Sequence, residues 1–326
     1  MASLKVLKSR IKSIHTTRKI TKAMQLIAAA RLKGIRRKVD AAKVYMEEVH
    51  DLVESLVPDG IYDQLRVNNY GNGGDSNSAS DNTRMDSRTE SCKGTLIVLF
   101  TADRGLCGQF NGAIIKASRK EIATIGRDNI EVLCMGRKGY EALKKDGVTF
   151  ATNSYISYPQ IKSISFLNMK ESILEIVNAT RKYKRYILIY SNYVSMVKQE
   201  VVIEESLFPT CDTQMSSTAR DDVHNSVDQF GDDQSRVGKY KMSFDGGKRL
   251  VLQRTIEQYS IARVFNIILT SMLSEYAARM LAMDGATRNS TKMLDTLSRQ
   301  YNQNRQSQIT RELIEIISGM EAIETA

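Results

Sequence analysis

Apolar residues at both ends of the chain recur at alternating spacings of three and four, which is the pattern of a coiled-coil seam. In the N-terminal part the repeat follows Leu4, Leu7, Ile11 and Ile14 and then Ile35, Val39, Ala42, Met46, Val49, Val53 and Leu56. In the C-terminal part it follows Leu269, Leu273, Tyr276, Met280 and Met283 and then Leu294, Leu297 and Tyr301. The pattern predicts two long helices, over 1–57 and 248–326, that pair as an antiparallel coiled coil. At 1.5 Å per residue the second helix reaches roughly 100 Å and projects past the first.

The middle of the chain alternates short apolar runs with helical patterns, as parallel α/β sheets do. The predicted strands are Thr95–Thr101, Glu131–Met135, Val148–Phe150 and Tyr186–Ser191, with antiparallel edge strands at Gln199–Ile203 and Lys239–Phe244. The predicted helices are Phe110–Arg127, Arg137–Lys145 and Ile164–Lys184. The sequence therefore predicts an α/β fold in which a small Rossmann-like domain, residues 94–247, is inserted between the two coiled-coil helices.

Two stretches lack apolar periodicity and are rich in small polar residues. Residues 58–93 contain the run NNYGNGGDSNSASDN, and residues 209–238 carry paired aspartates. Such segments bury too little apolar surface to offset the loss of chain entropy on folding. We predict a flexible insertion at 58–93 and disorder at 209–238.

Positive charge is concentrated in the first helix. Residues 1–43 hold 13 lysines and arginines and one acid, Asp40, whereas the net charge of the whole chain is +10. This helix predicts an acidic partner surface; nucleic acid is the competing partner, and a solvated helix face needs no partner. A basic amphipathic N-terminus is also typical of a mitochondrial transit peptide, but the seam continues well past residue 30, which indicates mature structure. No apolar run of about 18 residues occurs, so no membrane span is predicted.

The sequence contains no convincing catalytic, cofactor or metal site. The three histidines have no cysteine or carboxylate at metal or triad spacing, and the four cysteines form no C-x-x-C pair. The run TADRGLCGQFN, Thr101–Asn111, follows a buried strand and opens a helix, where phosphate often binds. Its glycines do not fit G-x-G-x-x-G, and no Walker lysine follows. We interpret this run as a structural turn with a buried thiol at Cys107. Its turn residues are Asp103, Arg104, Gly105 and Gly108.

The C-terminal end of the second helix is apolar on every side. The residues concerned are Ile309, Leu313, Ile314, Ile316, Ile317 and Met320. A helix that is apolar all round must be enclosed. One partner helix cannot enclose it, whereas a sleeve of other subunits could.

Four motifs resemble the γ subunit of F-type ATP synthases. They are ITKAM at 20–24 with the alanines at 28–30, the turn TADRGLCGQFN, the run SEYAARMLAM at 274–283, and a series of positions from Tyr301-Asn302 to Ser318-Gly319. They follow the family's order and cover both ends and the middle of the chain. Gln109 departs from the family's usual glycine and Met320 from its usual alanine. The chloroplast relatives carry an inserted cysteine pair as a redox switch, whereas the segment 209–238 here holds only Cys211, so we do not expect that regulation.

The resemblance implies a central rotor shaft that couples ion flow through the membrane sector to ATP synthesis or hydrolysis on the catalytic ring. Its implied partners are the α and β subunits of that ring, the ε subunit and the membrane c-subunit ring, with no nucleic acid and no direct membrane insertion. Catalysis is expected on β, so this chain is expected to be no enzyme and to hold no cofactor. The implied location is peripheral, on the cytoplasmic face of the bacterial inner membrane.

The resemblance also implies roles for single residues. The positions matching rotor–stator contacts are Met24, Arg279, Gln306, Thr310 and Glu312, and the apolar tip matches a low-friction bearing. The foot contacts fall at about Lys241–Asp245. The alternative hypothesis is a coiled-coil nucleic-acid-binding protein, which predicts strongly salt-dependent DNA binding. A nucleotide-using α/β enzyme would need the phosphate loop that the sequence lacks.

Overall fold

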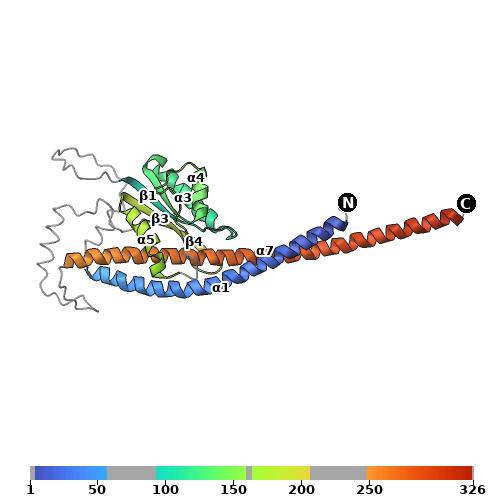
Figure 1. Cartoon of the computed structure of the whole chain (residues 1–326), viewed down its shortest axis with the longest axis horizontal. Helices are drawn as coiled ribbons and strands as arrows, with labels where there is room; N and C mark the ends of the chain where they lie inside the picture. Colours follow the sequence, from blue (N-terminus) through green and yellow to red (C-terminus); the bar gives the residue numbers. More distant parts are fainter. Residues whose placement is uncertain (1–3, 57–92, 159–163, 206–247, 325–326) are drawn as a thin grey trace.

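The computed structural model describes residues 4–56, 93–158, 164–205 and 248–324, which form a long rod with an α/β domain on one side (Figure 1). Two helices make the rod, α1 (Leu4–Leu56) and α7 (Lys248–Glu324). They run antiparallel, and the C-terminal end of α7 extends well past the start of α1 (Figure 1). The predicted coiled coil of the two terminal helices is confirmed.

The face of α1 that packs on α7 keeps its three–four spacing throughout, but its chemistry changes in the middle. Between Ile14 and Ala28 the spacing falls on the polar residues Arg18, Thr21 and Gln25. Two of them have direct partners on α7. The Thr287 hydroxyl donates a 2.9 Å hydrogen bond to Thr21, and the Gln25 amide donates a 2.8 Å bond to a carboxylate oxygen of Asp284. A polar layer within an apolar seam favours one register, because a shifted pairing leaves its groups without partners.

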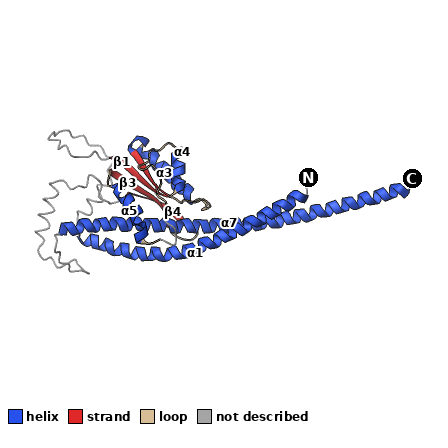
Figure 2. Ribbon diagram, viewed as in Figure 1, coloured by secondary structure: helices blue, strands red, loops and turns tan. Residues whose placement is uncertain are grey.

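The α/β domain contains a four-stranded sheet with the order β2-β1-β3-β4. The strands are β1 (Lys93–Phe100), β2 (Ile130–Met135), β3 (Tyr183–Tyr193) and β4 (Gln199–Glu205). β1 pairs in parallel with β2 and β3, and β4 pairs antiparallel with β3. The sheet lies beside the rod, next to α7 (Figure 2).

Both faces of the sheet are covered, which explains why β1 is a continuous apolar run. Leu96, Val98 and Phe100 pack with residues of α5 and α7, whereas Ile97 and Leu99 belong to the cluster with α3 and α4. The remaining elements are α3 (Phe110–Ile125), the 3₁₀ turn η1 (Arg127–Asn129), α4 (Arg137–Lys145) and α5 (Phe166–Thr180). The rod is therefore part of the domain core, since α7 covers one face of the sheet.

Some predicted boundaries differ from the structure. The helix expected over Ile164–Lys184 ends at Thr180, because residue 183 already pairs with β1. The strand expected at Val148–Phe150 is reduced to one bridge between Phe150 and Val132. The edge strand expected at Gln199–Ile203 is confirmed as β4.

Other predictions fall where the structure gives no description. The strand at Lys239–Phe244, the flexible insertion and the disordered segment lie wholly or almost wholly outside the described residues, and the division into domains stays a prediction. Within the described residues, no helix is both long enough and apolar enough to cross a membrane.

Candidate functional site

The turn 101–111 connects the carboxyl end of β1 to α3 and is tied to two other loops. The Asp103 carboxylate accepts the backbone N–H of Arg137 at 3.0 Å and that of Tyr158 at 3.2 Å. Leu106 and Gly108 both have left-handed backbones, with φ of 64° and 59°. A non-glycine residue in that region is uncommon and signals a constrained loop. The turn therefore holds Leu106 outward in a fixed conformation, with 58% of that residue exposed.

A buried ion pair on α7 lies against this turn. Arg279 and Glu275 are separated by 2.6 Å and one helical turn, and their side chains are only 10% and 9% exposed. Arg279 also makes longer contacts of 3.4 Å to the carbonyl oxygens of Arg104 and Gly105. Burial raises the pKa of Glu275, and the neighbouring Arg279 charge opposes that rise. The pair thus joins α7 to the turn in a poorly solvated place.

Further polar contacts join α7 to the ends of the strands. The Ser274 hydroxyl donates to the carbonyl oxygen of Ser191 at 3.0 Å. Arg263 binds both carboxylate oxygens of Glu204, at 2.7 and 2.6 Å. Together with the Arg279 contacts they are spread along α7 over several turns. We call these contacts the joint. The α/β domain is therefore attached to α7 at several points along the helix and not at one.

The tip of α7 is built differently, because it is exposed on all sides. Every residue from 302 to 320 is exposed, and the six apolar residues of the tip are between 46% and 63% exposed. Thr310 bonds back to the Gln306 carbonyl at 3.0 Å, and Glu312 accepts from Gln308 at 2.8 Å. These bonds stay within one helix. The tip therefore offers apolar and polar groups to a partner.

The predicted rotor–stator residues occupy different environments. Gln306, Thr310 and Glu312 lie on the exposed tip, Met24 is half-buried beside the polar layer, and Arg279 is buried in the joint. The structure brings only Arg279 together with the predicted turn. Sequence reasoning missed Glu275, although its four-residue spacing from Arg279 was a signal, and it missed the polar layer, whose signal was the loss of apolar residues within an intact seam.

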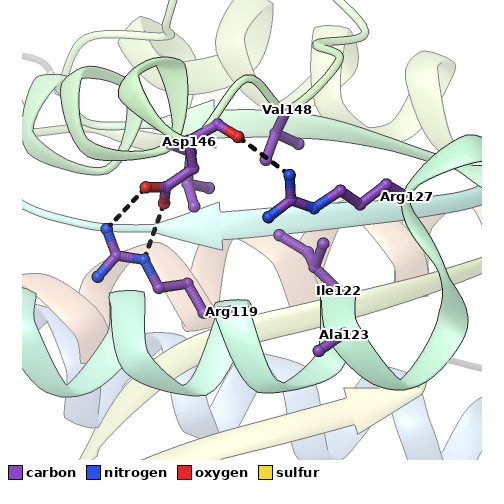
Figure 3. Close-up of a pocket in the computed structure, with 7 residues that line it drawn as sticks. Arg119, Ile122, Ala123, Arg127, Asp146 and Val148 are labelled. Atoms are coloured by element: carbon purple, nitrogen blue, oxygen red, sulfur yellow. Dashed lines mark hydrogen bonds and ion pairs between the residues drawn. The ribbon is translucent and has the colours of Figure 1, made fainter.

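A pocket of about 470 Å³ lies between α3 and the end of α4 (Figure 3). Arg119 holds the Asp146 carboxylate in a two-pronged contact of 2.8 and 3.1 Å, and Arg127 reaches the Asp146 carbonyl oxygen at 3.5 Å. The rest of its lining is apolar. The pocket contains no nucleophile or paired acid and base, and no three metal-binding side chains cluster within the described part of the chain.

Comparison with known proteins shows which family the chain belongs to. The family model described as ATP synthase matches residues 3–323. The chain is 32% identical to the ATP synthase gamma chain of Parvibaculum lavamentivorans, over 99% of this chain and 100% of that one. The chain belongs to the ATP synthase gamma family. It is also 33% identical to the gamma chain of Rhodospirillum rubrum, again over 99% of this chain and 100% of that one.

A solved structure shares the gamma-family fold. The rotor of the Euglena gracilis mitochondrial ATP synthase matches with a TM-score of 0.58 and 18% identity, over 94% of this chain and 98% of that chain. At that identity the likeness shows the fold alone. The expected family and fold are confirmed, and as a gamma chain the protein is a non-catalytic stalk subunit, a peripheral part of a membrane-associated complex. The roles of single residues stay predictions.

Proposed function

We propose that this gamma-family chain is the rotating central shaft of an F-type ATP synthase, coupling ion flow through the membrane sector to ATP synthesis or hydrolysis on the catalytic ring. The observation that carries the proposal is the exposed apolar tip of α7. Burying apolar surface is favourable by about 25 cal/mol per Å². The six apolar tip residues form a broad stripe beside charged residues such as Arg311 and Glu315, and a ring of other subunits around the tip would cover that stripe at every angle of rotation.

An apolar tip also suits movement within the sleeve. The hydrophobic effect is non-directional, so it holds the tip in place at every angle of rotation. Directional contacts, by contrast, favour particular angles. Gln306, Thr310 and Glu312 lie on the same tip and supply hydrogen-bonding groups that can form in one rotary state and break in the next.

The joint supports the second half of the proposal, which is the transfer of torque. In this proposal the α/β domain receives torque from the c-subunit ring beside the ε subunit, and the joint passes it to α7. The α and β subunits surround the tip, and Met24 contacts β. Arg279, buried at 8% exposure, acts on β through the turn that it holds. The predicted foot contacts at Lys241–Asp245 lie outside the described residues.

The location follows from the same proposal. The relatives named above are bacterial, and we place the complex at the cytoplasmic face of the bacterial inner membrane, without insertion of this chain into the bilayer. One shaft can serve both ATP synthesis and ATP hydrolysis, so the same geometry fits either direction of the reaction.

Co-expression with the α and β subunits from the same source tests the proposal. We expect a stable complex that contains one copy of this chain per catalytic ring and hydrolyses ATP. Deleting residues 309–326 should weaken assembly or hydrolysis while leaving the fold of the isolated chain intact, because the exposed tip contributes little to it. A chain that stays apart from α and β and instead binds DNA, with an affinity that falls steeply with salt, would be a nucleic-acid-binding protein.

A further inference from the structure

Tyr276 of α7 contacts two arginines that come from different helices. Arg31 of α1 donates a 3.3 Å hydrogen bond to the Tyr276 hydroxyl, and its guanidinium carbon lies 5.8 Å from the ring centre. The guanidinium carbon of Arg279 lies 5.2 Å from the same ring centre. Both distances allow cation–π attraction. We call Arg31, Tyr276 and Arg279 the arginine–tyrosine clamp.

The clamp continues the joint into α1. Arg279 is held by Glu275 and reaches the carbonyl oxygens of the turn 101–111, so a chain of contacts runs from the turn through Arg279 and Tyr276 to Arg31. Burial raises the pKa of Glu275, the nearby Asp103 adds to the rise, and the charges of Arg279 and, more weakly, Arg31 oppose it. Arg31 therefore acts on the buried carboxylate as well as on the tyrosine.

We infer that Arg31 is a positioning residue, which fixes the turn at one angle around the shaft through Tyr276 and Arg279. α1 packs mainly on α7 and also reaches the α/β domain directly, where the Lys38 ammonium donates to the Ile164 carbonyl oxygen, so the clamp is a second connection, between α1 and the turn. The role rests on the proposed rotary function, in which torque applied to the domain must turn both helices together. Without the clamp, the turn loses this link to α1 and can shift relative to the shaft while the seam remains paired.

Distance measurements in the full chain test the clamp directly. Spin labels are placed at the exposed positions Lys33 on α1 and Leu106 in the turn, in a background without other accessible cysteines, and the distance distribution is recorded by electron resonance. Arg31→Met should raise the ratio of displaced to docked conformers about fivefold, as expected for the loss of one such interaction. Arg36→Met, which removes the same charge from an exposed position of α1, should leave the distribution unchanged.

Tyr276→Phe separates the two parts of the clamp, because it keeps the ring and removes the hydroxyl that Arg31 binds. Its distribution should be intermediate between the distributions of the wild type and Arg31→Met. A distribution for Arg31→Met that matches that of Arg36→Met overturns the clamp. Thermal unfolding of each variant ensures that the comparison is made well below its melting temperature.

A functional measurement shows whether the clamp transmits torque. In vesicles with the complete complex, Arg31→Met should lower the number of ions pumped per ATP hydrolysed, while Arg36→Met should not. An unchanged ratio despite a widened distance distribution overturns the positioning role. If the wild-type chain does not assemble with α and β, the proposed function fails, and the spin-label distances still decide whether Arg31 holds the turn.

Discussion

Replacing Arg279 with methionine should destabilise the isolated chain strongly. The substitution keeps a long flexible side chain but removes the guanidinium that lies 2.6 Å from Glu275. Both side chains are about nine-tenths buried, so Glu275 is left as a buried carboxylate without its main partner. Breaking a buried ion pair by removing one partner costs about 3–5 kcal/mol. We expect the free energy of unfolding to fall by about that amount at pH 7.

Urea unfolding followed by circular dichroism measures this loss, and the same helix provides a matched control. Arg288 and Asp284 form another ion pair at 2.6 Å with the same four-residue spacing, but their side chains are 67% and 33% exposed. Exposed pairs contribute about 0–1 kcal/mol, so Arg288→Met should have a small effect. If Arg279→Met costs no more than Arg288→Met, burial does not give the first pair its importance and the reasoning fails.

The loss should also depend on pH with a definite sign. The folded-state pKa of Glu275 is already above its ordinary value of 4.5 because of burial, and removing Arg279 raises it further. A raised folded-state pKa means that protonated Glu275 is the better-tolerated form, so its stabilising contribution is complete below 4.5 and is lost as pH rises through the folded-state pKa. The deficit of Arg279→Met should therefore shrink on acidification from pH 7 towards 4.5. A constant deficit, or a double variant Glu275→Gln/Arg279→Met no more stable than the single one, contradicts the argument.

Three further substitutions test other parts of the molecule. Gly136→Ala should cost about 3 kcal/mol, because Gly136 has φ of 98° and a Cβ there stands 1.9 Å from the Thr101 carbonyl oxygen; unchanged urea unfolding speaks against this. Thr287→Val alone should cost about 1 kcal/mol by removing the hydrogen bond that the Thr21 hydroxyl accepts, whereas valine at both positions should be nearly neutral. A double variant less stable than the single one refutes the polar layer. Ile317→Asp should change the free energy of unfolding of the isolated chain by less than about 0.5 kcal/mol, yet it should lower ATP hydrolysis by the reconstituted complex. Normal hydrolysis by this variant would contradict a bearing role for the tip.

The elements that the sequence predicts well are those whose signal is local. The seams of α1 and α7 repeat over many turns, and the apolar run of β1 is continuous because both faces of the strand are covered. The end of α5 is different. Arg181 and Lys182 suit a helix as well as a loop, and pairing with β1 decides where β3 begins. Such a boundary depends on pairing with a strand far away in the sequence. The local helical pattern therefore predicted a helix that ends too late.

The joint could be predicted only in part for a related reason. The spacing of Glu275 and Arg279 suggests an ordinary surface pair on a helix, and nothing local reveals that both are buried. Part of the cover over Arg279 comes from the turn 101–111, which lies more than 150 residues earlier in the chain. The family resemblance implies that Arg279 lies near the contact with β, and that role stays a prediction. In this chain the Arg279 side chain is directed to the turn 101–111.

The packing that stabilises α7 is distributed unevenly along the helix. Residues 271–279 are all buried, since α1 covers one side and the sheet the other, whereas every residue from 302 to 320 is exposed. Most helical stability in proteins comes from the packing of an apolar face, so the unpacked tip draws little stability from this chain. Enclosure by other subunits would supply both apolar burial and helical order there. In the proposed rotor, the two roles would fall on different lengths of one helix, with torque received where α7 is fully packed and the bearing formed where it is exposed.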